Sequence, residues 1–84
     1  MYSVLIERAA EKALAKLSAE MRQRTIAAIK ALAENPRPSG CRKLTGSEND
    51  WRIRVGDYRV IYEIADEIRV VRIHRVRHRR EAYR

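Results

Sequence analysis

Two short runs of alternating residues, separated by a single turn, constrain the fold of this chain more than any other feature. The runs WRIRV (51–55) and YRVIYEI (58–64) place apolar residues at nearly every second position, which is typical of half-buried strands. Gly56-Asp57 lies between them and favours a tight turn. The two runs predict a β-hairpin with one apolar face, and we expect Arg52, Arg54 and Arg59 on the other face.

The first forty residues have a different period. Residues 2–7 are rich in β-formers and predict an opening strand, whereas residues 8–17 repeat apolar side chains at helical spacing. Ser18 is a good N-cap for a second helix, which Asn35-Pro36 ends. After a turn at 65–67, residues 68–76 predict a last strand. The pattern predicts an α+β fold with an N-terminal strand, a two-helix hairpin, and a C-terminal antiparallel sheet with the helices packed on one face.

Size and composition limit the class of protein. A chain of 84 residues is expected to form one domain, 1–84, because so short a chain cannot divide its core. Cys41 is the only cysteine, so an internal disulfide is excluded and a reducing cytoplasm is the expected compartment. The N-terminal apolar run, Val4–Ile6, is too short for a signal peptide or a membrane span. We therefore expect no membrane association.

Positive charge dominates the chain and is concentrated near its end. The net charge is +8, and residues 69–84 hold seven arginines and one glutamate. A cationic sheet face beside a basic tail with an aromatic ring favours a polyanion, and single-stranded RNA fits best. The expected RNA-binding residues are Arg75, Arg77, His78, Arg80 and Arg84. Two simpler interpretations stay open: the strand arginines only solvate a sheet opposite carboxylates such as Glu63, and the tail is a nonspecific basic terminus.

Few residues could carry other chemistry. His74 and His78 are the only groups that ordinarily titrate near neutral pH, and a lone strand histidine such as His74 is more often structural. Two histidines without a third convergent ligand do not predict a metal site. Cys41, between Gly40 and Arg42, is a weak candidate for a reactive thiol. The sequence therefore predicts no cofactor and no metal.

The run WRIRVGDYRVIYEI, followed after one turn by VVRIHRVRHRREAYR, resembles the RelE branch of the RelE/ParE toxin superfamily of toxin-antitoxin systems. The helix stop at Asn35-Pro36 and the segment Arg42-Lys43-Leu44 before the sheet agree with it, so the resemblance covers nearly the whole chain. It implies a small α+β toxin that enters the ribosomal A site and cleaves messenger RNA without a metal. The ribose 2′-OH attacks the adjacent phosphate, and the 5′-oxygen leaves.

The resemblance also implies which residues carry out the cleavage. The catalytic set falls on Arg52, Arg54, Arg59, Arg79 and Tyr83, with Arg77 as an alternative to Arg79. The first two positions are lysine in the best-known member of the family. An arginine is a poor general base because its guanidinium stays protonated in proteins, so Tyr83 or His78 would have to move the proton.

The expected partners are the ribosome, messenger RNA and a cognate RelB-like antitoxin. An acidic, amphipathic antitoxin would neutralise the cationic surface, in a hetero-oligomer that can bind operator DNA through the antitoxin. Two alternatives remain: a ParE-like toxin that inhibits DNA gyrase without cutting RNA, and a family member that binds an antitoxin but has lost catalysis.

Overall fold

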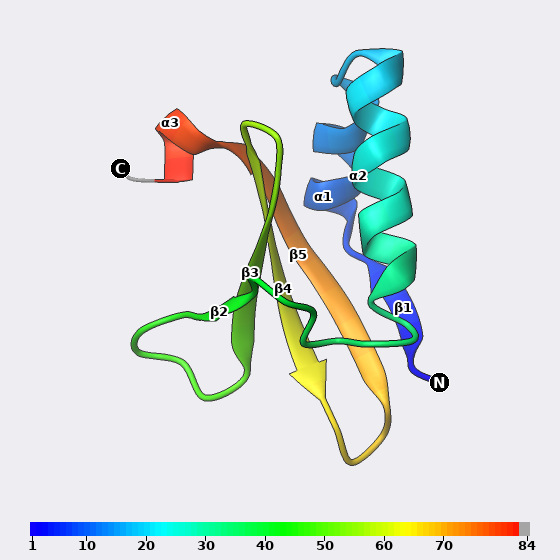
Figure 1. The fold of residues 1–84 in the computed structure, drawn as a ribbon, viewed down its shortest axis with the longest axis vertical. Coiled ribbons are helices and arrows are strands. Elements are labelled where there is room, and N and C mark those ends of the chain that lie inside the picture. Colours follow the sequence, from blue (N-terminus) through cyan, green and yellow to red (C-terminus); the bar gives the residue numbers. More distant parts are fainter. Residues whose placement is uncertain (83–84) are drawn as a thin grey trace.

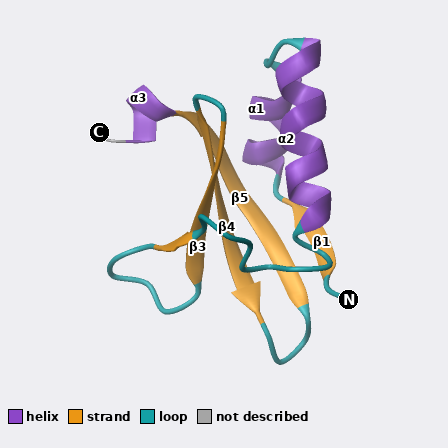
Figure 2. Cartoon of the chain, viewed as in Figure 1, coloured by secondary structure: helices purple, strands orange, loops and turns teal. Residues whose placement is uncertain are grey.

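A five-stranded sheet with two helices on one face forms the molecule (Figures 1 and 2). The computed structural model describes the backbone of residues 1–82 and the side chains of residues 1–80. The elements, in chain order, are β1 (Ser3–Ile6), α1 (Arg8–Ala15), α2 (Ala19–Ala31), β2 (Arg42–Lys43), β3 (Asp50–Val55), β4 (Tyr58–Ala65), β5 (Val70–His78) and α3 (Arg79–Ala82). The predicted α+β class is confirmed.

The strands follow the order β1-β5-β4-β3-β2. Strands β3 to β5 pair antiparallel, as predicted, and the short strand β2, which was not predicted, adds antiparallel to β3. Strand β1 runs parallel to β5, which makes the sheet mixed. The two helices lie between β1 and the rest of the sheet in sequence, and such a crossover lets β1 and β5 run in the same direction. We call the face of the sheet that carries α1 and α2 the helix face, and the opposite face the open face (Figure 1).

Local signals set the bounds of both long helices. Ser18 caps α2 as predicted, because its Oγ accepts a hydrogen bond of 3.2 Å from the backbone N–H of Met21. The helix ends at Ala31, several residues before the predicted stop at Asn35-Pro36. The backbone N–H groups of Leu32, Ala33 and Glu34 each bond to a carbonyl three residues back, so the last turn tightens before the prolines are reached.

The hydrophobic core lies between the helices and the helix face of the sheet. Ile29 and Leu32 from the helical half pack with Tyr62, Ile64 and Ile73 of the central strands, and all five are essentially inaccessible to solvent. The Tyr62 hydroxyl donates a hydrogen bond of 2.8 Å to the Pro36 carbonyl. Burial raises the pKa of this phenol well above its ordinary value. The hydroxyl therefore stays protonated and anchors the loop after α2 to the sheet.

A second anchor joins the same loop to the turn between β4 and β5. Arg37 binds Asp66 through two nitrogens, at 3.2 and 2.8 Å, and the Tyr2 hydroxyl donates to the same carboxylate at 2.6 Å. The Arg37 and Tyr2 hydrogen bonds lower the pKa of Asp66 from 3.8 to about 2. The Arg37 guanidinium also lies 5.1 Å from the centre of the Trp51 ring, a cation–π distance.

The last strand differs from its predicted bounds. We expected it at residues 68–76, but β5 spans Val70–His78. Ile68 is 68% exposed in the preceding turn, and Arg69 has a φ of 54°, a left-handed conformation that suits a turn and not a strand. At the other end Arg77 and His78 still pair with Arg59 and Tyr58.

Within the described residues, no helix is long and apolar enough to cross a membrane.

Candidate functional site

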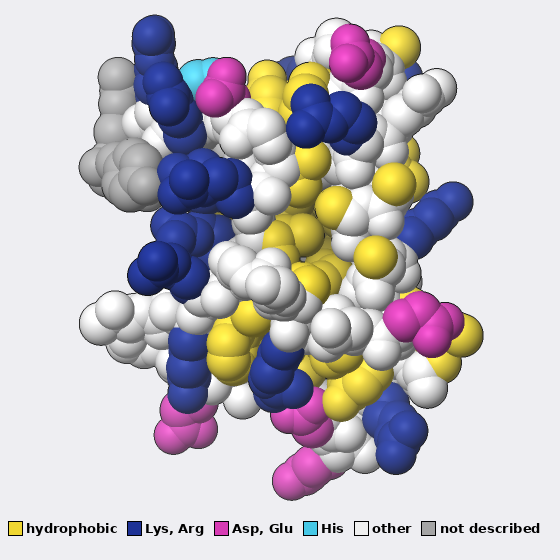
Figure 3. All heavy atoms as spheres, in the orientation of Figure 1, with side chains coloured by type: hydrophobic (Ala, Val, Ile, Leu, Met, Phe, Trp, Pro, Cys, Tyr) yellow, Lys and Arg dark blue, Asp and Glu magenta, His cyan; other side chains and the backbone are white. Residues whose placement is uncertain are grey.

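Arginines gather on the open face of the sheet. Because side chains alternate along a strand, β3 turns Ile53 and Val55 toward the core and Arg52 and Arg54 away from it, as predicted. We call the cationic surface formed by these arginines and their neighbours the arginine face; its members are Arg42, Arg52, Arg54, Arg59, Arg75 and Arg77. Dark blue side chains cover the side of the molecule away from the two long helices (Figure 3).

Strand register aligns three of these arginines across the sheet. Arg54 of β3 lies opposite Arg59 of β4, and Arg59 lies opposite Arg77 of β5. Arg59 is on the predicted face, but unlike Arg54 it is buried there, with only 3% of its surface exposed. Its neighbours flank it on both sides, and α3 contacts the adjoining ends of β4 and β5. The central guanidinium is therefore held in place, while Arg54 is exposed and Arg77 half-buried.

The two candidates for the C-terminal arginine occupy different positions. Arg77 is in line with Arg54 and Arg59, whereas Arg79 begins α3 beyond the end of β5. The Arg79 backbone N–H bonds to the Asp57 carbonyl at 2.7 Å, and its Nε lies 3.9 Å from an Asp57 carboxylate oxygen. The neighbouring Arg80 is also in α3 and is exposed. The geometry thus places Arg77, which the sequence ranked second, within the row of guanidiniums.

His78 lies on the helix face. Its ring meets that of Tyr58 edge-on, with centroids 5.3 Å apart. Both rings line a small pocket under α1, together with Ala13 and Val76. The sheet therefore separates the His78 ring from the arginine face, contrary to its expected place among the RNA-binding residues. Tyr83 and Arg84, the other two residues expected at the C-terminal end of the site, lie outside the described residues.

His74 is the histidine on the open face. It is the extra residue of a bulge in β5, because Ile61 pairs with Arg75 and Tyr62 with Ile73. The His74 side chain is 28% exposed, with Nδ1 2.5 Å from a Glu7 carboxylate oxygen and Nε2 3.7 Å from one of Asp50. The fold thus places this ring between two carboxylates, a convergence that the sequence alone did not show.

The only described side chains grouped closely enough to hold a metal ion are Asp50, Glu63 and His74, with one donor atom from each within 4.8 Å of the others. The sequence missed this convergence because the three residues lie on different strands. Arg72 donates to Glu63 at 2.8 Å, and Glu7 holds His74. The group therefore has cationic and hydrogen-bonding partners of its own, and it forms the acidic boundary of the arginine face.

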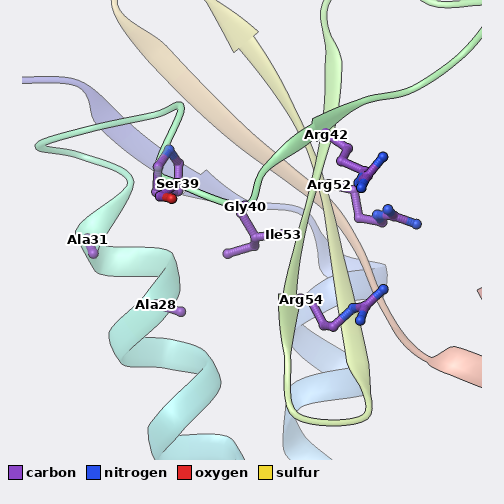
Figure 4. Close-up of a pocket in the computed structure, with 9 residues that line it drawn as sticks. Ala28, Ala31, Ser39, Gly40, Arg42, Arg52, Ile53 and Arg54 are labelled. Carbon is purple, nitrogen blue, oxygen red and sulfur yellow. The ribbon is translucent and has the colours of Figure 1, made fainter.

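A pocket of about 460 Å³ opens between α2 and the outer edge of β3 (Figure 4). Ala28 and Ala31 of α2 and Ile53 of β3 form its apolar walls. Arg42, Arg52 and Arg54 also line this pocket, but their guanidiniums extend away from Ala28 and Ala31 (Figure 4). The three guanidiniums thus lie on the open face of the sheet. Arg42, on the short strand β2, is a member of the arginine face that the sequence did not single out as a site residue.

The model of the ParE toxin of type II toxin-antitoxin systems matches residues 4–83. The chain is thus a toxin-class protein of a type II toxin-antitoxin system. It belongs to this family and, with it, to the RelE/ParE superfamily. No curated protein sequence matched the chain significantly.

Solved structures of RelE toxins resemble the whole domain. The archaeal RelE-RelB complex from Pyrococcus horikoshii OT3 contains a chain with 31% identity and a TM-score of 0.84, over 93% of this chain and 94% of that one. The RelBE2 toxin-antitoxin complex of Mycobacterium tuberculosis gives 28% identity and a TM-score of 0.80, over 92% and 96%. Isolated Escherichia coli RelE gives 25% and 0.81, over 99% and 96%. The predicted relationship to RelE is confirmed.

Proposed function

We propose that this protein is an endoribonuclease that cleaves messenger RNA in the ribosomal A site and thereby inhibits translation. The observation that carries the proposal is the row Arg54, Arg59 and Arg77 across the open face, in which Arg54 is exposed, Arg77 is half-buried and Arg59 lies between them. Neither Arg54 nor Arg77 forms an ion pair with an acidic side chain of residues 1–80. Their charge is therefore available to a phosphodiester. The similarity to RelE toxins supports the same function.

The proposed reaction is an internal transesterification. The ribose 2′-oxygen forms a bond to the adjacent phosphorus as its proton leaves, and the bond from phosphorus to the 5′-oxygen breaks, with a proton delivered to that oxygen. Negative charge grows on the phosphate oxygens in the transition state. Guanidiniums held by three neighbouring strands can stabilise this charge, and loss of one such donor typically costs about 10²- to 10³-fold in rate.

We assign charge stabilisation to Arg52, Arg54 and Arg59, and to Arg77 in the role first expected of Arg79. Arg79 then lies at the edge of the site, beside Asp57. Proton transfer needs another group, since a guanidinium stays protonated. His78 is on the helix face, so we propose Tyr83 for this step, with the ribosome positioning the nucleotides.

We further propose an acidic antitoxin as the partner of this chain. The P. horikoshii and M. tuberculosis relatives were solved as toxin-antitoxin complexes. An acidic, amphipathic segment would neutralise a chain of net charge +8. The resulting hetero-oligomer would bind operator DNA through the antitoxin. Coelution with the product of the neighbouring gene at moderate salt tests this partnership, and failure to coelute would contradict it.

Inhibition of DNA gyrase is the second candidate function, because the matching family model is named for ParE. The two functions separate in purified systems. We expect the protein to cut messenger RNA on a ribosome halted with a defined codon in the A site, and to leave gyrase supercoiling unchanged at the same concentration. Gyrase inhibition without RNA cleavage would reverse this assignment.

A further inference from the structure

The arginine face contains a second row of side chains beside the first. The first row is Arg54, Arg59 and Arg77. In the second row, Arg42 of β2 lies opposite Arg52, Arg52 opposite Ile61, and Ile61 opposite Arg75. Residues two apart on one strand are separated by about 6.5 to 7 Å. The two rows therefore run side by side across the sheet at about that distance.

The outer part of the second row is positively charged and uncompensated. Arg42 and Arg52 are direct cross-strand partners, and like charges in that position are destabilising. Among residues 1–80, no acidic side chain forms an ion pair with Arg42, Arg52 or Arg75. Arg42 is exposed, and its side chain extends in the same direction as those of Arg52 and Arg54 (Figure 4). An anionic ligand would relieve this repulsion.

Beyond the second row, the open face changes sign. Asp50 lies opposite Glu63, and the two carboxylates surround His74 with Glu7 nearby. Arg72 lies opposite Glu63 and pairs with it at 2.8 Å, so the charge of Arg72 is matched by that carboxylate. The carboxylates of Asp50 and Glu7 make this end of the face unfavourable for phosphate. We therefore expect a bound nucleic-acid backbone to follow the two arginine rows across the sheet toward β2, and not to run lengthwise toward Asp50.

We propose that Arg42, at the outer end of the second row, forms a second phosphate subsite that holds the phosphate next to the one being cleaved, with Arg52 between this subsite and the first row. The inference rests on the proposed function and extends it from one phosphate to two. The spacing of the rows is close to that of adjacent phosphates in an extended single strand. Ile61 supplies an apolar surface for the ribose or base between Arg52 and Arg75. Arg42 is a binding residue that positions the strand and does not contact the reacting atoms.

Binding of short, uncleavable RNAs tests the subsite directly. We would measure fluorescence anisotropy of 5′-labelled 2′-O-methyl dinucleotide and trinucleotide probes, which hold one and two internal phosphates, across a salt series. For Arg42→Gln we expect about tenfold weaker binding of the trinucleotide, a log–log salt slope reduced by about 0.7, and dinucleotide binding within about twofold of the parent. Lys43→Gln is the matched control, because Lys43 is the exposed neighbour on the same strand but faces the other way.

Each outcome supports or overturns the phosphate subsite at Arg42. Equal effects of Arg42→Gln and Lys43→Gln, or an equal loss with both probes, would overturn the subsite. On halted ribosomes, Arg42→Gln should raise the KM for cleavage and retain the kcat, because it weakens binding outside the reacting centre. If the parent cuts RNA but Arg42→Gln keeps its KM, the subsite fails and the proposed function stands. If the parent does not cut RNA but the probes behave as expected, the subsite stands and the proposed function fails.

Discussion

Arg54 and Arg59 lie directly opposite each other on adjacent antiparallel strands, although both carry a positive charge. A cross-strand pair of like charges reduces stability, and Arg77 on the next strand adds a third charge to the row. Folding alone would favour a neutral or acidic residue at one of these positions. This row of like charges is the observation behind the proposed phosphate site.

The first prediction separates activity from stability at Arg54. Arg54→Ala should lower the rate of messenger-RNA cleavage by about 10²- to 10³-fold, while the free energy of unfolding stays within about 0.5 kcal/mol of the parent. Single-turnover cleavage on halted ribosomes and urea unfolding measure the two quantities. Lys30→Ala removes one exposed charge from α2 and is the control. If both variants cut RNA equally well, Arg54 has no part in the site.

The second prediction concerns the two C-terminal arginines. Arg77→Ala should reduce cleavage about as strongly as Arg54→Ala, since both end the same row. Arg79→Ala should have a smaller effect, because Arg79 lies at the start of α3 beside Asp57. Comparing the two single-turnover rates tests the assignment. A larger loss for Arg79→Ala than for Arg77→Ala would restore Arg79 to the catalytic role.

The third prediction follows from the position of His78. His78→Gln should leave the cleavage rate and its pH profile nearly unchanged, because the sheet lies between this ring and the arginines. Loss of the edge-on contact with Tyr58 should lower the free energy of unfolding by about 0.5 to 1.5 kcal/mol. A rate loss above about tenfold with a changed pH profile would show that His78 moves a proton.

The fourth prediction is a stability effect at the buried anchor. Tyr62→Phe leaves the Pro36 carbonyl without its hydrogen bond and should lower the free energy of unfolding by about 1 to 2 kcal/mol. Tyr58→Phe is the control, since no hydrogen bond of the Tyr58 hydroxyl is present within residues 1–80. Urea unfolding measures both. Equal stabilities for the two variants would mean that the Pro36 contact contributes nothing.

The fifth prediction concerns acid. Because the folded-state pKa of Asp66 is about 2 and its ordinary value is 3.8, the carboxylate contributes stability above about pH 4, and this contribution disappears as the pH falls toward 2. The Tm should therefore drop less over that interval in Asp66→Asn than in the parent. Glu67→Gln, one residue away in the same turn, should follow the parent. Parallel Tm curves for Asp66→Asn and the parent would contradict the prediction.

Much of the fold and part of the site were predictable from local patterns. Alternation in the β3–β4 hairpin predicted both strands and the face of Arg52 and Arg54, and Ser18 predicted the start of α2. These features depend on neighbours in sequence. Three features depend on contacts between residues far apart in sequence, and no local pattern predicts them: the parallel pairing of β1 with β5, the two-residue strand β2 and the burial of Arg59.

The histidines show the same limit. The basic tail in which His78 lies predicts RNA binding for it, but strand alternation turns its ring to the helix face. His74 was taken for a structural residue of the strand, and a bulge in β5 brings it to Glu7 and Asp50. A bulge changes which face later residues occupy, and its position is decided by the pairing of two strands.

Primer extension on messenger RNA from cells that express the protein tests the central claim most directly. For the parent we expect cuts within codons at the A site, which disappear when translation initiation is blocked and are absent with Arg54→Ala. Intact messenger RNA during growth arrest by the parent, or cuts that persist without translation, would contradict a ribosome-dependent nuclease at the arginine face.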